Sequence, residues 1–220
     1  MDSLSGVGVI DKSTHILAAL RRGPLDLAAL SEATRLPRAT AHRLAAALEH
    51  HGLLRRDSQG RFCLGFELIG LGRAAAEQFG LAELAAPVLA ALRDECGESV
   101  QLFVREDGGR RCVVSLHSPH ALRWIVPEGS LFPLGLGSAG RVLTAEAKMP
   151  RSGWIESVEE REPGVASVSA PVRDSGGLVV AALSVSGPIE RMTRSPGRRL
   201  GSAVVSAAER LSQRLAGGAS

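Results

Sequence analysis

The residues of this chain most suited to chemistry lie in the stretch PRATAHRLAAALEH, residues 37–50. Its apolar residues recur at the spacing of one helix face and are predicted to point into a core: Ala41, Leu44, Ala45 and Leu48. The other side of the helix would present small, polar and basic residues: Arg38, Ala39, Thr40, His42, Arg43, Ala46 and His50. The one acid, Glu49, lies at the far end of the stretch. This acid-poor face favours an anionic partner.

Double-stranded DNA is the partner that these side chains fit. Arginine donates two hydrogen bonds to guanine, and threonine contacts a phosphate or a thymine methyl group. In a helix-turn-helix the second helix enters the major groove and reads base edges from its N-terminal half. We therefore predict base contacts from Arg38, Ala39, Thr40, His42 and Arg43. The alternative is a solvated basic face on an ordinary helical subdomain.

The segments around this stretch predict the frame that positions it. A helix is expected over residues 11–21, ended by Gly23-Pro24, and a second over 27–34 with Asp26 as its N-cap. The third helix is expected to begin at Pro37, whose missing N–H costs nothing in a first turn. Two short strands, 53–57 and 61–65, then follow as a hairpin. Three helices and a hairpin are the order of a winged helix-turn-helix, and three hairpin residues are predicted to neutralise DNA phosphates: Arg55, Arg56 and Arg61.

The distribution of charge agrees with this interpretation. The chain has 220 residues and a net charge of +3. Residues 1–65 contain nine Lys and Arg against six Asp and Glu, whereas the remaining residues contain seventeen of each. The whole excess of positive charge therefore lies in the segment predicted to bind DNA.

The rest of the chain is predicted to be α+β. Helices are expected over 66–80 and 81–97, and a final helix from Pro196. Between them lie strand patterns at 99–106, 110–117, 165–172 and 178–187, joined in the last pair by a turn-rich spacer. Such a run of strands indicates a mainly antiparallel sheet. The best domain boundary is near residue 80.

Two polar patterns stand out in this second part. The segment GLGSAG, residues 135–140, matches a dinucleotide-binding motif, but Pro and Gly interrupt the strand that such a site needs before it. Its glycines are instead expected to open a helix whose free N–H groups favour a small anion. Two further pairs alternate with apolar residues and would put hydroxyls on one strand face: Ser167 and Ser169, Ser184 and Ser186. These serines would either line a polar pocket or face solvent.

Other classes of site find little support in the sequence. We see no paired acid and base and no activated nucleophile, so no catalytic residue is predicted. Three widely spaced cysteines and the pair His117 and His120 predict neither a disulfide framework nor a metal site, and no cofactor is expected. No signal peptide or apolar segment of membrane-spanning length is expected, which predicts a cytoplasmic protein. The alternatives are a small-molecule-binding enzyme with an accessory helical domain and a protein-interaction module.

Four segments together resemble the IclR family of bacterial transcription regulators: LPRATAHRLAAALEHHGLLRRDSQGRFCLG, FPLGLGSAGRVLTA, EREPGVASVSAPV and VVAALSVSGP. Two C-terminal segments, EREPGVASVSAPVR and VSGPIERMTRSPGR, are especially similar to the branch linked to amino-acid and leucine biosynthesis control. The resemblance implies a winged helix-turn-helix domain over 1–65, a linker helix over 66–80, and a GAF-like effector-binding and oligomerisation domain over 81–220. It also implies a regulator rather than an enzyme, acting as a homodimer or a dimer of dimers on a pseudo-palindromic operator.

The resemblance further implies a pocket for a small carboxylate effector, such as an amino acid or a keto acid. Its residues would be Gly137, Ser138, Ala139, Ser157, Ser167, Ser184 and Ser186. Ser157 stands where family members commonly have an acid, and Ser167 where they commonly have a cysteine. After Ala145, family members usually carry an additional helix and loop before the segment that matches RSGWIESVEE. If this chain lacks that additional segment, the pocket would be open on one side.

Overall fold

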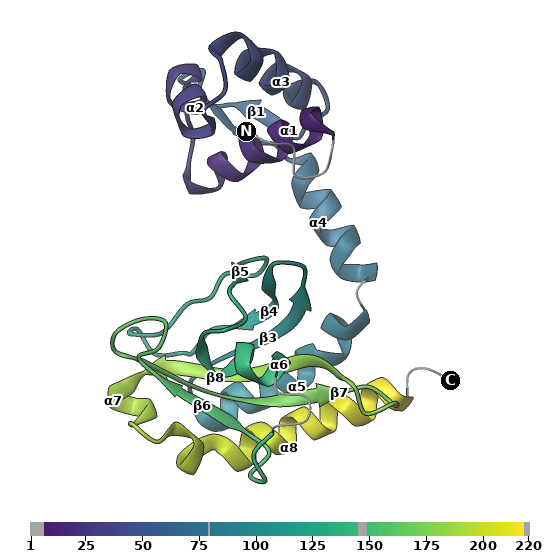
Figure 1. Cartoon of the computed structure of the whole chain (residues 1–220), viewed down its shortest axis with the longest axis vertical. Helices are drawn as coiled ribbons and strands as arrows, with labels where there is room; N and C mark the ends of the chain where they lie inside the picture. The colour runs from purple at the N-terminus through teal and green to yellow at the C-terminus, as the bar shows by residue number, and fades with distance from the viewer. Residues whose placement is uncertain (1–6, 79, 145–148, 218–220) are drawn as a thin grey trace. The chain divides into compact units, whose positions relative to one another are not determined.

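The computed structural model describes residues 7–78, 80–144 and 149–217. The chain divides into two compact units, Met1–Gln78 and Phe79–Ser220 (Figure 1). Among the described residues, no single helix has the length and apolar composition to cross a membrane. The segments 67–75 and 80–96, which are bent relative to each other, reach that length and composition only when taken together.

The N-terminal unit contains helices and one two-stranded hairpin. Its elements are α1 (Gly8–Ala19), α2 (Leu27–Thr34), α3 (Arg38–His50), β1 (Leu54–Arg56), β2 (Phe62–Leu64) and α4 (Glu67–Gln78). The first three helices and the hairpin enclose one aliphatic core that includes Ile16, Leu30, Leu44, Leu54 and Phe62. The predicted winged helix-turn-helix architecture is confirmed, and the inward face predicted for α3 is the buried one.

Two helix boundaries differ from prediction. The first helix begins three residues earlier than expected, at Gly8, and ends two residues earlier, at Ala19, where the chain continues as a 3-10 turn, Leu20–Arg22. The helix α3 begins one residue later than expected. Pro37 has an extended ψ of 140° and is the N-cap, and its carbonyl accepts the Ala41 N–H at 2.9 Å. The predicted N-cap of α2 is correct, since the Asp26 carboxylate accepts the first-turn N–H of Ala29 at 2.8 Å.

The C-terminal unit is built on a six-stranded antiparallel sheet of order β5-β4-β3-β8-β7-β6. The strands are β3 (Ser99–Glu106), β4 (Gly109–Leu116), β5 (Leu131–Phe132), β6 (Ile155–Val158), β7 (Val165–Arg173) and β8 (Val179–Pro188). The helices are α5 (Gly80–Cys96), α6 (Gly137–Thr144), α7 (Ile189–Met192) and α8 (Pro196–Gly217). The predicted antiparallel sheet is confirmed; the short strands β5 and β6 carry no sequence pattern strong enough to predict them.

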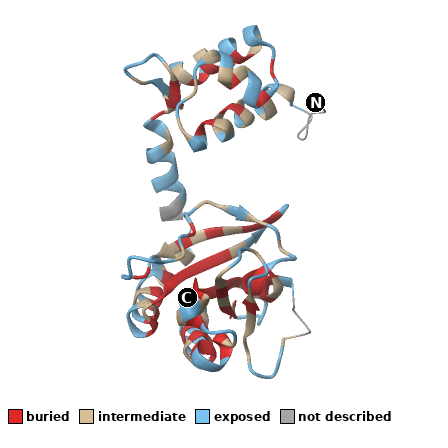
Figure 2. Cartoon of the chain, turned by 90° about the vertical axis from the view of Figure 1, so that its left-hand side faces the viewer, coloured by how far each residue is buried: buried red, intermediate tan, exposed pale blue. Residues whose placement is uncertain are grey.

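Helices cover both faces of this sheet (Figure 1). The helices α5 and α8 bury Leu89 and Leu211 against one face, in a cluster that includes Val168 of β7. The helix α6 buries Val142 on the opposite face, in a second cluster with Phe103 of β3. The central strands are therefore buried on both sides, as Figure 2 shows. Residues that point toward α6 lie between two rigid layers, and this is where the polar residues gather.

Candidate functional site

The exposed face of α3 carries the five predicted base-contacting residues. Arg38, Ala39, His42 and Arg43 are exposed, and Thr40 is partly buried. Neither arginine forms an ion pair with any described residue, so both guanidinium groups are available to an external anion. The buried face of the helix fixes its orientation in the unit, and the exposed face is left for recognition.

The three predicted hairpin arginines have different surroundings. Arg56 pairs with Glu49 of α3 at 3.2 Å and lies over the Phe62 ring at 4.1 Å. Arg61 pairs with Asp57 at 2.7 Å. Internal carboxylates therefore already neutralise both of these guanidinium groups. The third, Arg55, lies over the Phe66 ring at 5.0 Å and has no ion-pair partner among the described residues.

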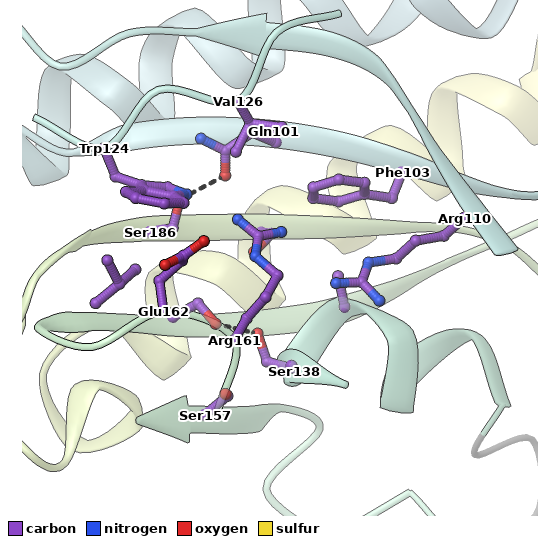
Figure 3. Close-up of a pocket in the computed structure, with 15 residues that line it drawn as sticks. Gln101, Phe103, Arg110, Trp124, Val126, Ser138, Ser157, Arg161, Glu162 and Ser186 are labelled. Carbon is purple, nitrogen blue, oxygen red and sulfur yellow. Dashed lines mark hydrogen bonds between the residues drawn. The ribbon is translucent and has the colours of Figure 1, made fainter. Parts of the chain in front are cut away.

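A cavity of about 420 Å³, including its open mouth, lies between the sheet and α6 (Figure 3). The structure brings all seven predicted effector residues together around it: Gly137, Ser138, Ala139, Ser157, Ser167, Ser184 and Ser186. Eight further lining residues were not predicted: Gln101, Phe103, Arg110, Trp124, Val126, Arg161, Glu162 and Val165. These come from β3, β4, β7 and two connecting segments, and no spacing in the sequence relates them.

The serines of β7 and β8 form a connected hydroxyl network beneath α6. Ser169 lies opposite Ser184 in the strand register, and Ser167 lies opposite Ser186. The Ser138 hydroxyl is 2.7 Å from those of both Ser167 and Ser169, and Ser169 donates to Ser184 at 2.9 Å. The inward, pocket-lining arrangement is therefore the correct one of the two alternatives for these serines.

The glycine motif has a packing role that the sequence does not disclose. A Cβ atom on Gly140 would lie 2.1 Å from the Leu134 carbonyl oxygen, and Gly137 has a left-handed φ of 76°. The strand before the motif, β5, pairs antiparallel with β4, whereas a dinucleotide fold requires parallel strands.

The prediction that the first N–H groups of this helix are free is wrong at Gly137. Its N–H donates to the Glu160 carboxylate at 3.1 Å. The same carboxylate pairs with Arg141 at 3.0 Å. An internal acid, brought in by the segment between β6 and β7, therefore occupies the position expected for an external anion.

Two arginines dominate the electrostatics of the cavity. Arg110 of β4 is only 2% exposed, and Arg161 reaches the cavity from the segment after β6. Burial, together with the charge of Arg161, lowers the pKa of Arg110 to about 10. Burial likewise lowers the pKa of Arg161 below its ordinary value. The pocket therefore places two positive charges in a largely buried space, an arrangement that favours an anionic ligand over a cationic one.

Two family models match this chain. The model for the bacterial transcriptional regulator IclR C-terminal domain matches residues 73–151 and 147–213, and the model for the IclR helix-turn-helix domain matches residues 9–58. The chain belongs to the IclR family. It is a DNA-binding transcription regulator with a C-terminal effector domain, and its two structural units correspond to the two matched parts of IclR proteins.

Individual IclR-family relatives are similar over nearly the whole chain. The glycerol operon regulatory protein of Streptomyces griseus is 26% identical over 245 residues, covering 95% of this chain and 96% of the relative. The transcriptional repressor IclR of Escherichia coli K12 is 23% identical over 223 residues, with coverages of 85% and 81%.

Solved structures of IclR proteins share the fold. The regulator from Alicyclobacillus acidocaldarius has a TM-score of 0.80 at 22% identity, covering 94% of this chain and 98% of that chain. An IclR homologue from Microbacterium hydrocarbonoxydans, complexed with 4-hydroxybenzoate, has the same TM-score and coverages at 19% identity. The predicted departure after Ala145 falls on residues 145–148, which lie outside the described residues. The two matches to the C-terminal domain meet at the same place, over 147–151.

Proposed function

We propose that this IclR protein binds a pseudo-palindromic operator as a homodimer or a dimer of dimers. Each subunit would place α3 in the major groove of one half-site, with half-sites one helical turn or a multiple apart. The observation that carries the proposal is the two-sided character of α3. It buries Leu44 and Leu48 while it presents Arg38 and Arg43 to solvent, and neither arginine pairs with an acid in the part of the chain that the structure describes.

Within this proposal the residues of the N-terminal unit have two kinds of role. Base contacts come from one face of α3: Arg38, Ala39, Thr40, His42 and Arg43. Phosphate contacts come from the hairpin: Arg55, Arg56 and Arg61. Arg56 and Arg61 contact a phosphate only by leaving Glu49 and Asp57, so we assign the larger phosphate contribution to Arg55.

The C-terminal unit is proposed to bind a small carboxylate effector in the cavity beneath α6. The support is the anion-receptor character of the lining, together with the 4-hydroxybenzoate carried by one homologue of the same fold. The effector would act by binding more tightly to one geometry of the dimer, which sets the spacing of its two α3 helices. We assign DNA binding to residues 1–65, coupling to 66–80, and effector binding and oligomerisation to 81–220.

The proposed setting is the cytoplasmic control of metabolic genes. Curated relatives are named as regulators of several such systems, including the glycerol operon of Streptomyces griseus and the acetate operon of Salmonella typhimurium. The C-terminal motifs EREPGVASVSAPVR and VSGPIERMTRSPGR favour amino-acid biosynthesis of the leucine type. A keto acid or dicarboxylate of such a route fits the positive cavity better than the amino acid itself.

The rival function is a small-molecule-binding enzyme with an accessory helical domain. Such an enzyme needs a general base near a nucleophile. Among the described residues that line the cavity there is no histidine, and the central hydroxyls hydrogen-bond to one another. These features favour a binding pocket.

A genomic capture experiment tests the proposal. Purified protein would be incubated with fragmented genomic DNA, and the bound fragments sequenced with and without candidate carboxylates. The expected result is enrichment of promoter fragments that share two half-sites in inverted order. Equal recovery of promoter and random fragments in dilute salt would refute operator binding.

A further inference from the structure

The cavity beneath α6 contains two guanidinium groups that lack a carboxylate partner. Arg110 donates from Nη1 to the Pro133 carbonyl oxygen, and its buried Nε has no hydrogen-bond partner. Arg161 lies over the faces of Phe132 and Trp124, at 4.4 Å and 5.4 Å from the ring centroids. Neither arginine forms an ion pair within the part of the chain that the structure describes.

Burying the positive charges of Arg110 and Arg161 near each other raises the free energy of the folded protein unless a negative charge lies close by. Aromatic faces compensate a buried cation only in part, and the charge of each arginine opposes that of the other. Arginine stays protonated in proteins at neutral pH, and burial lowers the pKa of Arg110 only to about 10. The cavity therefore holds two positive charges that an anionic ligand would neutralise.

The neutral groups of the cavity are arranged to donate as well. The Nε2 atom of fully buried Gln101 and the indole N–H of Trp124 have no hydrogen-bond partner among the described residues. The Gln101 Oε1 atom, by contrast, already accepts the Ser186 hydroxyl at 2.8 Å. Figure 3 shows these groups around the same space as the two guanidinium groups. The one carboxylate of the lining, Glu162, is exposed to solvent; its charge opposes the lowering of the Arg161 pKa, but it forms no ion pair with Arg161 among the described residues.

We propose that the cavity selects a small dianion: a molecule with two carboxylate groups, or a phosphate. This inference rests on the proposed function, because it specifies the effector of the same pocket. A dianion places one negative charge against each guanidinium group and accepts from the free donors. A zwitterionic amino acid would bring an ammonium group into a space that already holds two cations, and a monoanion leaves one cation uncompensated.

Calorimetric titration of the full-length protein at constant ionic strength tests the proposal. The probes are malonate, succinate, glutarate and phthalate, each beside its monoamide, together with leucine and inorganic phosphate. We expect at least one dicarboxylate to bind about tenfold or more tightly than its monoamide. If inorganic phosphate binds and no dicarboxylate binds more tightly than its monoamide, the ligand of the cavity is a phosphate. Monoamides that bind as tightly as their dicarboxylates, or leucine binding more tightly than every dianion, would overturn the proposal.

Substitution of one arginine tests whether its guanidinium group causes the preference for a dianion. Arg161→Met should remove most of the preference for dianion over monoamide, because it deletes one of the two charges that face the cavity. Arg123→Met is the matched control, since this exposed arginine donates only to backbone carbonyl oxygens and lies outside the lining. A preference that survives Arg161→Met, or is lost equally in Arg123→Met, contradicts the assignment.

A DNA-binding measurement distinguishes a failure of this inference from a failure of the proposed function. Binding to an enriched promoter fragment is measured by fluorescence anisotropy with and without the dianion that binds. A dianion preference without any promoter selectivity would retain the pocket assignment and reject the regulator proposal. Promoter selectivity with no preference for dianions would reject the pocket assignment alone.

Discussion

The Glu160 carboxylate accepts a hydrogen bond from the backbone N–H of Gly137, 3.1 Å away, at the first residue of α6. Its other oxygen pairs with Arg141 one turn further along the helix, at 3.0 Å. The acid therefore joins the segment after β6 to the helix that covers the cavity. Arg161, which contributes one of the two guanidinium groups of the pocket, is the next residue of the same segment.

Glu160→Gln should loosen the start of α6. The substitution removes a negative charge from a helix N-terminus, which is worth about 0.3–1 kcal/mol, and weakens the pairing with Arg141. We expect faster amide hydrogen exchange in the peptide that contains Gly137. The control is Glu209→Gln, which changes an exposed acid of α8. Unchanged exchange in Glu160→Gln would mean that Glu160 does not hold this helix.

Gly140→Ala should destabilise the C-terminal unit far more than Gly135→Ala. A Cβ atom at position 140 meets the Leu134 carbonyl oxygen at 2.1 Å, whereas nothing lies within 4 Å of one at position 135. Overpacking of this kind costs about 1–3 kcal/mol. Denaturant unfolding of both variants measures the difference. Equal loss in the two variants would contradict the close approach seen at Gly140.

Arg43→Ala should weaken binding to the preferred operator by about 1–3 kcal/mol while it leaves binding to random duplex nearly unchanged. The reason is that Arg43 lies on the exposed face of α3 without an acid partner among the described residues. Fluorescence anisotropy with operator and scrambled duplexes measures both affinities. An unaltered ratio between them would exclude a base contact from this residue.

Arg55→Ala should weaken binding to every duplex and reduce the salt dependence by about one phosphate contact. Arg56→Ala should have a smaller effect, because Arg56 is already paired with Glu49 at 3.2 Å. Freeing it by Glu49→Gln is expected to strengthen binding without regard to sequence. The slope of log affinity against log salt concentration, measured for the three variants, reports the number of phosphate contacts in each. A larger loss in Arg56→Ala than in Arg55→Ala would reverse these roles.

The stability of the protein should fall as pH rises above the ordinary range of a thiol, about 8.5. Burial, followed by the charge of Glu128, raises the pKa of the fully buried Cys112 to about 12. The unfolded chain then loses this proton at a lower pH than the native chain, so raising the pH favours unfolding. Two other cysteines, two lysines and Arg110, whose pKa burial lowers to about 10, also titrate in this range, so a Cys112 variant is needed to isolate the thiol.

Urea unfolding at pH 7.5 and pH 10 measures this effect. A single thiol with such a shift accounts for a loss of about 2 kcal/mol at pH 10. Cys112→Ala should lose less stability than the unsubstituted protein over the same interval. An equal loss in the two proteins would assign the pH dependence to other groups.

Local patterns in the sequence predict the elements well, because their causes are local. The spacing of Leu44 and Leu48 places α3 on its core, and Asp26 caps α2 from three residues away. The alternation at Ser184 and Ser186 likewise predicts which strand face carries hydroxyls. Each of these inferences needs only the geometry of one helix or one strand.

The electrostatic character of the pocket depends on contacts between distant segments. Arg110 has the sequence context of an exposed residue at the start of a strand, yet it is buried, and its guanidinium group donates to the Pro133 carbonyl oxygen, 23 residues away. Glu160 reaches Gly137 across 23 residues. No periodicity relates such pairs. The sequence therefore predicts the small residues of the pocket and misses its charges.

One wall of the cavity is an indole. Trp124 faces the ligand space beneath the Arg161 guanidinium group, while Trp154, the other tryptophan of the chain, packs against the α5 and α8 side of the sheet. A molecule that draws Arg161 away from the ring changes the surroundings of one fluorophore and leaves the second as an internal reference. We therefore expect ligand binding in this cavity to change the intrinsic fluorescence of the protein through Trp124.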